Sequence, residues 1–176
     1  MKKITLLFFL AGSLVMIFVL AKTGEPLITP STPGGILNLE LAFTNTKSDL
    51  VINTWASINP VDGLAAAKSN TWLDFIFILF YSGFLFGSCK NISTLFAGAF
   101  GRAGKVVAKA ALLAGILDGL ENTGMLISLA GHGSAFISLA TGVCSAIKWG
   151  LAILALFYVI TGGVAFLRSA VRNRRG

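Results

Sequence analysis

The segment 117–122, with the sequence LDGLEN, holds the residue types in this chain that are best suited to chemistry. Glu121 and Asn122 follow Asp118 by three and four residues, so on a helix all three share one face. Their neighbours are apolar, and an ionisable side chain at mid-membrane costs about 3 kcal/mol, which makes each one a functional candidate. We expect Asp118 and Glu121 to accept protons or to bind a cation or polar ligand, with Asn122 orienting them.

Lys148 is the predicted counter-ion of this face. His132, in a tight GHG turn, lies 14 residues after Asp118 and 16 residues before Lys148. Two antiparallel helices joined at that turn would place Asp118 and Lys148 at a similar depth, because the rise per residue is constant. The spacing therefore predicts an ion pair inside the bilayer.

Three further side chains complete the predicted pocket. Asp74 lies 16 residues before Lys90, and Glu121 lies 16 residues after Lys105. Both lysines mark the predicted cytoplasmic end of their helix, so the two carboxyls are predicted to lie at the same depth in the membrane. Tyr81 follows Asp74 by seven residues, which places both on one polar stripe. Glu40 belongs to the loop outside the membrane, where we expect it to cover the mouth of the pocket.

The charges of this pocket do not balance. Asp74, Asp118 and Glu121 face one ammonium, and an uncompensated net charge is untenable in a low dielectric. Either some carboxyls are protonated or a cation is bound. Oxygen ligands suit a hard cation, with Asp118 and Glu121 as its ligands if a metal binds, whereas zinc is not expected beside a single histidine. No cofactor motif is found.

The elements that position these residues must be membrane-spanning helices. Of the 176 residues 55% are hydrophobic and 12% are charged, against about 25% charged in soluble domains. A soluble fold of this size could not bury so much apolar surface. Four apolar runs approach the ~20 residues that cross a bilayer, so we predict an all-α integral membrane protein with a four-transmembrane-helix bundle. The predicted spans are 4–21, 72–89, 110–130 and 135–167.

The first run has two interpretations. Residues 19–21, with the sequence VLA, resemble a signal-peptide cleavage site, but the run is longer than a usual signal-peptide core, which favours an uncleaved anchor.

The basic residues predict the orientation. With the N-terminus inside, ten of the 14 lysines and arginines fall on the cytoplasmic side and three fall outside, which satisfies the positive-inside rule. Both termini are then cytoplasmic. The rule also accounts for the net charge of +7, so we do not expect a nucleic-acid partner. The basic tail 168–176 is interpreted as contacting anionic lipid headgroups.

The whole chain, 1–176, forms a single predicted membrane domain. Its largest connection is an extracytoplasmic loop of ~50 residues, 22–71, and a shorter cytoplasmic loop covers 90–109. The alternating sequence LNLELAF, 37–43, predicts either a short strand or an interfacial helix. Thr46–Asp49 reads as a capping box that begins a short helix.

Each polar signal also has a purely structural interpretation. Thr71 and Asp74 fit a capping box at the outer end of the second span. The pair Lys148–Trp149 fits a membrane interface, which would shorten the fourth span to 150–167 and separate Lys148 from Asp118. The LDGLEN face fits interhelical hydrogen bonds worth ~1 kcal/mol each. Cys89 and Cys144 are interpreted as packing residues rather than as a disulfide.

Four segments together carry a resemblance: PGGILNLELAF, LDFIFILFY, LDGLEN and KWGLAILALFYVITG. They are similar to segments of small uncharacterised bacterial four-transmembrane-helix proteins. The resemblance covers most of the chain and implies the four-span fold and the bacterial inner membrane. It implies no activity.

Three functions remain open from the sequence. The first is a membrane-embedded module that binds or transports a proton, a cation or a small polar or lipid ligand. A four-span monomer is small for a transporter, so a homo-oligomer is then expected. The second is an accessory subunit that docks on a partner membrane protein. The third is an intramembrane lipid-modifying enzyme that uses paired carboxyls as acid and base, although no nucleophile stands out.

Overall fold

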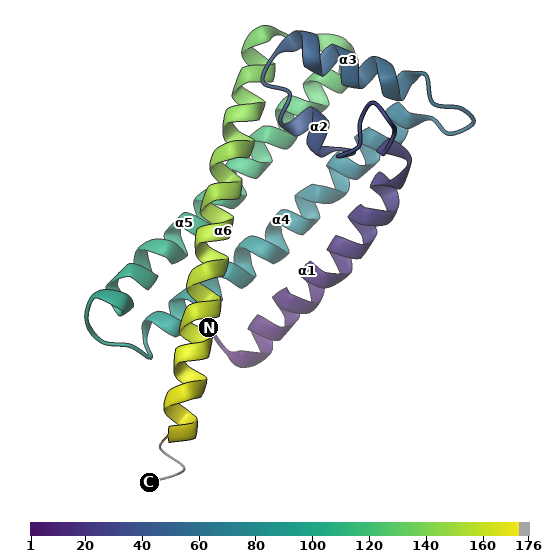
Figure 1. Ribbon diagram of the computed structural model, residues 1–176. Helices are drawn as coiled ribbons and strands as arrows, with labels where there is room; N and C mark the ends of the chain where they lie inside the picture. Colours follow the sequence, from purple (N-terminus) through teal and green to yellow (C-terminus); the bar gives the residue numbers. More distant parts are fainter. Residues whose placement is uncertain (173–176) are drawn as a thin grey trace.

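The computed structural model describes residues 1–172, which are mostly helical and contain no β-strand. Four long helices form the body of the molecule, and short helical segments connect them (Figure 1). The helices are α1 (Lys3–Gly24), α2 (Leu37–Glu40), α3 (Asn45–Ala56), α4 (Gly63–Ser93), α5 (Gly98–Ile127) and α6 (Ala135–Arg172), with a 3₁₀ turn η1 (Glu25–Leu27) and a π-helical turn η2 (Ser128–His132).

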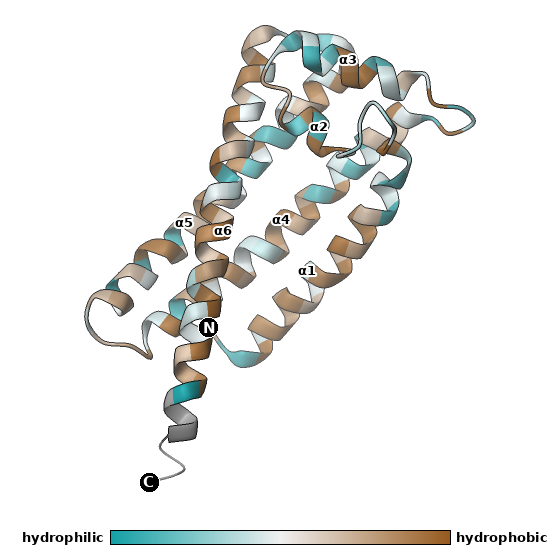
Figure 2. Ribbon diagram, in the orientation of Figure 1, coloured by the Kyte–Doolittle hydropathy of each residue, from teal (hydrophilic) through white to brown (hydrophobic). Residues whose placement is uncertain are grey.

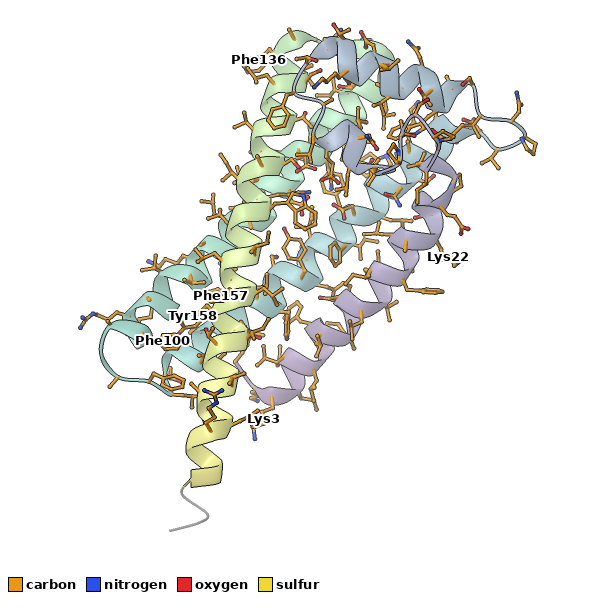
Figure 3. All side chains as sticks on the ribbon, in the orientation of Figure 1. Lys3, Lys22, Phe100, Phe136, Phe157 and Tyr158 are labelled. Carbon is orange, nitrogen blue, oxygen red and sulfur yellow. The ribbon has the colours of Figure 1, made fainter. Side chains whose placement is uncertain are left out.

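Three of the helices are long and apolar enough to cross a membrane. They are Lys3–Leu27, Gly63–Ser93 and Ala135–Arg168, with mean hydropathies of 2.7, 1.6 and 2.2. Hydrophobic residues predominate along α1 and α6 (Figure 2), and many large apolar side chains of these helices are exposed. Phe136 and Phe157 of α6, labelled in Figure 3, have 80% and 66% of their surface exposed. Such outward apolar surface is stable only against a non-aqueous solvent.

α4 is the central helix of the bundle. It packs against α1, α5 and α6, and α5 and α6 pack against each other. Glycines allow the close approach of α1, because a Cβ at Gly83 would lie 2.7 Å from the Phe9 ring and a Cβ at Gly12 would overlap the ring of Phe80. α1 therefore lies on the α4 side of the molecule rather than against α5.

The loop between α1 and α4 folds over one end of the bundle, which we call the loop end (Figure 1). Trp55 of α3 is fully buried there, and its Nε1 donates to the carbonyl of Leu27 and to Oγ1 of Thr32, at 3.0 and 3.2 Å. These bonds hold α3 and the 28–36 segment together. A buried apolar cluster around Trp55, which includes Leu39 and Met125, packs the loop onto α4 and α5.

The sequence left a strand and a helix open for residues 37–43, and the structure has the helix. Leu37–Glu40 form the single-turn helix α2, and Leu39 and Glu40 are both buried, which the period-two alternation of a strand would prevent. The next helix is capped by Thr44, whose Oγ1 accepts from the amide of Lys47, so α3 begins before the predicted capping box at Thr46.

The long helices extend beyond the predicted spans. α4 begins nine residues before Trp72, with Asp62 as its N-cap, and α5 begins at Gly98 instead of residue 110. The capping role proposed for Asp74 is therefore wrong: Thr71 lies inside α4 and donates to the carbonyl of Ala67. α6 continues through residue 172, and residues 173–176 of the predicted tail lie outside the described residues.

Candidate functional site

The predicted carboxylate face of α5 points into the protein. Asp118 is 3% exposed, and Glu121 and Asn122 are fully buried. Small residues on the same helix allow this, since a Cβ at Gly115 would lie 2.9 Å from the Cβ of Ser82 on α4. The close contact of α4 and α5 seals these polar side chains away from the apolar surroundings.

Lys148 lies at the centre of the site. Its Nζ is 2.6 Å from Asp118 Oδ1 and 2.9 Å from each carboxylate oxygen of Glu121, and the residue is 6% exposed. The depth match predicted from the turn at His132 is confirmed. Lys148 is buried within the continuous helix α6 and pairs with Asp118, so the separation of these two residues that the membrane-interface interpretation implied is wrong.

Glu40 adds a third carboxyl to Lys148, and α2 supplies it from the loop. Its Oε2 lies 3.5 Å from the ammonium and also accepts from Ser145 Oγ and Trp149 Nε1, at 3.3 and 3.4 Å. Glu40 is 7% exposed, so it forms part of the buried network itself, beyond the covering role that we expected.

The two α4 side chains join the network from the opposite side. Tyr81 donates its hydroxyl proton to Asp118 Oδ2 at 2.8 Å, and Asn122 Nδ2 donates to Asp74 Oδ2 at 2.7 Å. The structure therefore brings together all seven residues singled out in the sequence. They come from four elements: α2, α4, α5 and α6.

The site holds four carboxyls and one ammonium. Lys148 is shared among three of them, and Asp74 has no cationic partner within residues 1–172. Within that range no group of three or more histidine, cysteine, aspartate or glutamate side chains is arranged to hold a metal ion. The ammonium of Lys148 occupies the position between carboxylates that a bound cation would otherwise take.

A cavity of about 420 Å³ adjoins this network, within the usual range for ligand pockets. One side of it is polar, formed by the site residues, and the rest is largely apolar. α1, α4, α5 and α6 all contribute lining residues, and so do Ile28, Glu40 and the 34–37 segment of the loop. The apolar lining residues include Leu20, Ile28, Ile36, Leu37, Phe77, Met125 and Ala152.

Sequence reasoning missed two contributors to the cavity. Asn70 of α4 donates through Nδ2 to the carbonyl of Leu20 and to Oγ1 of Thr23, at 2.9 and 2.7 Å, and so fixes α1 at the edge of the cavity. Asn70 precedes Asp74 by four residues, so its position on the same helical stripe was a usable signal. The 34–37 segment carried no comparable signal, because its position depends on the fold of the whole loop.

In comparisons with known proteins, no family model, no curated protein and no solved structure matches this chain.

Proposed function

We propose that this protein is a multi-pass membrane protein whose cavity binds a small polar or lipid ligand next to the Lys148 network. The observation that carries the proposal is the cavity of about 420 Å³ with charged groups on one wall and apolar side chains on the others. A charged network used only to hold helices together needs no adjoining cavity. An amphipathic ligand matches both halves of the lining.

We further propose that α5 crosses the bilayer as a fourth span. α5 packs along both α4 and α6, which are apolar enough to span, so it lies at the same depth as they do. Its buried carboxyls meet Lys148 in the middle of α6. The distribution of basic residues then supports cytoplasmic termini and an extracytoplasmic α2–α3 loop, and the sequence resemblance supports the bacterial inner membrane.

Cysteine labelling tests this topology. In a chain without Cys89 and Cys144, we expect a membrane-impermeant maleimide to label Ser57→Cys on intact cells. Ala97→Cys, in the α4–α5 turn, should react only after permeabilisation. Both positions are exposed, so access to the reagent decides the result. Labelling of both variants on intact cells would contradict the four-span topology.

Native mass spectrometry of the purified full-length protein tests ligand binding. We expect the protein, released gently from detergent, to retain an amphiphile of defined mass. Ala152→Trp fills the cavity and should lose the amphiphile. Ala165→Trp makes the same change at an exposed position of α6 and should keep it. Equal retention, or no retention, in all three proteins would contradict a ligand in this cavity.

An accessory subunit is the second candidate, and one observation favours it. Gly150 of α6 has no side chain within 4 Å of its Cβ position, and Ala146, one turn earlier, is also exposed. Two small residues spaced by four allow another helix to approach closely, either from a second copy or from a partner membrane protein. Crosslinking through Gly150→Cys in membranes tests this: a discrete dimer or a partner adduct supports docking, and a monomer alone contradicts it.

A further inference from the structure

The side-chain hydrogen-bond donors on the cavity wall are all engaged within the protein. Tyr81 donates to Asp118, Trp149 donates to Glu40, and the ammonium of Lys148 faces three carboxyls. A ligand that needs a donor from these side chains would have to break an existing bond first.

The remaining polar wall residues follow the same pattern. Asn70 donates to α1, Thr71 donates to the backbone of its own helix, and Asn122 donates to Asp74. Each of these donor atoms therefore has at least one protein acceptor, and one N–H of the Asn122 amide is left over.

Acceptors, in contrast, are left over. Asn122 lines the cavity and is fully buried. Its Oδ1 has no hydrogen-bond partner among the described residues. Buried polar atoms without a partner are rare and call for an explanation. Asp74 also lines the cavity, and of its two carboxylate oxygens only Oδ2 accepts a hydrogen bond from a described residue. Apart from one N–H of Asn122, the unused polar capacity of the wall is thus acceptor capacity.

The charge of the cavity wall also favours a ligand that donates hydrogen bonds and is positively charged. Glu40, Asp74 and Asp118 line the cavity together with Lys148, whose ammonium is already shared. An anionic headgroup would meet these carboxyls without a free cation. A protonated amine brings positive charge and up to three donors, which is what the leftover acceptors can bind.

The apolar part of the cavity can bind an apolar chain of the ligand. α1 and α6 both line the cavity, and they pack against α4 rather than closely against each other. Two further lining residues, Ile28 and Trp149, are 60% and 45% exposed. In Figure 1, α1 and α6 lie on either side of α4. An apolar chain bound with its head at Asp74 can leave the cavity between α1 and α6, where the apolar outer faces of these helices continue.

We propose that the cavity binds an amphiphile with a protonated amine headgroup next to Asp74 and Asn122 and an apolar chain directed out between α1 and α6. This inference rests on the proposed ligand-binding function and specifies the class of its ligand. The amine can come from an aminolipid or from a single-chain amine.

The test is a thermal-stability titration of the purified full-length protein in a neutral detergent with dodecylamine, dodecanol and dodecanoate. We expect dodecylamine to bind about tenfold more tightly than dodecanol, because it forms charge-assisted hydrogen bonds, and dodecanoate not to stabilise the protein. Asp74→Asn keeps an acceptor for Asn122 and should remove the preference for the amine. Asp49→Asn makes the same change on exposed α3 and should leave the preference intact.

Each other outcome has a defined meaning. Equal or tighter binding of dodecanol or dodecanoate would overturn the amine headgroup while leaving the ligand-binding function standing. No saturable binding of any probe, together with no amphiphile retained in native mass spectrometry, would overturn both. Loss of the preference in Asp49→Asn as well as in Asp74→Asn would show that the amine acts on the surface and would overturn the proposed site.

Nanodiscs distinguish the two sources of the amine. Preferential retention of phosphatidylethanolamine over phosphatidylglycerol by the wild type, and not by Asp74→Asn, would identify an aminolipid. A preference for dodecylamine in detergent without that lipid preference would identify a single-chain amine. Preferential retention of phosphatidylglycerol would contradict the inference.

Discussion

Replacing Lys148 with methionine should destabilise this protein more than any other single substitution in the network. Methionine keeps most of the apolar length of the side chain and removes the ammonium, which lies 2.6 Å from Asp118, 2.9 Å from Glu121 and 3.5 Å from Glu40. Removing one partner of a buried ion pair costs about 3–5 kcal/mol. Because three carboxyls lose their cation here, we expect a loss of unfolding free energy near the upper end of that range.

Unfolding in mixed micelles with increasing dodecyl sulfate, followed by circular dichroism, measures this loss. Lys68→Met is the matched control, since Lys68 is exposed on α4 and forms no ion pair with a described residue. Adding Asp118→Asn and Glu121→Gln to Lys148→Met should restore part of the stability, because neutral amides leave no unpaired charge. A loss below about 1 kcal/mol for Lys148→Met, or no recovery in the triple variant, would refute our account of the network.

Three further substitutions test the packing around the cavity, each by thermal unfolding in detergent. Tyr81→Phe removes the hydroxyl that donates to Asp118 and should cost about 1–3 kcal/mol, and an unchanged melting temperature would contradict that bond. Gly115→Leu places a side chain against Ser82, which separates α4 from α5 and should lower the unfolding free energy by about 1–3 kcal/mol. Gly150→Leu is the control, because its position is open and the change should have little effect. Asn70→Leu removes two hydrogen bonds to α1 and should cost about 1–2 kcal/mol of unfolding free energy. Proteolysis within residues 25–36 should also become faster. An unchanged proteolysis rate would count against the role of Asn70.

The sequence predicted the pairing at the site because that pairing depends on quantities a sequence contains. The spacing within LDGLEN determines which α5 side chains share a face, and the distance from the turn at His132 determines the depth of Asp118 and Lys148. Because helix geometry is regular, the shared face of α5 and the equal depth of Asp118 and Lys148 are both found in the structure.

The loop was predicted less well, because its structure depends on tertiary contacts. The alternating pattern of LNLELAF is compatible with a strand, but burial of Leu39 against Trp55 and of Glu40 against Lys148 selects a single helical turn. The capping box at Thr71 and Asp74 failed for a related reason. We placed the start of the helix at Trp72, where the apolar run begins. In the structure α4 begins at Gly63, so Thr71 and Asp74 lie inside the helix and cannot cap it.

Under the proposed four-span topology, the network around Lys148 has a consequence for how the chain enters the bilayer during translation. Asp118, Glu121 and Lys148 would each cost about 3 kcal/mol to insert alone, and α5 is not among the helices apolar enough to insert unaided. Joined by the short connection 128–134, which includes η2, α5 and α6 bring these opposite charges together within 2.9 Å. We therefore expect the translocon to accept the two helices as one hairpin, so that a ribosome stalled before α6 emerges would leave α5 outside the hydrocarbon.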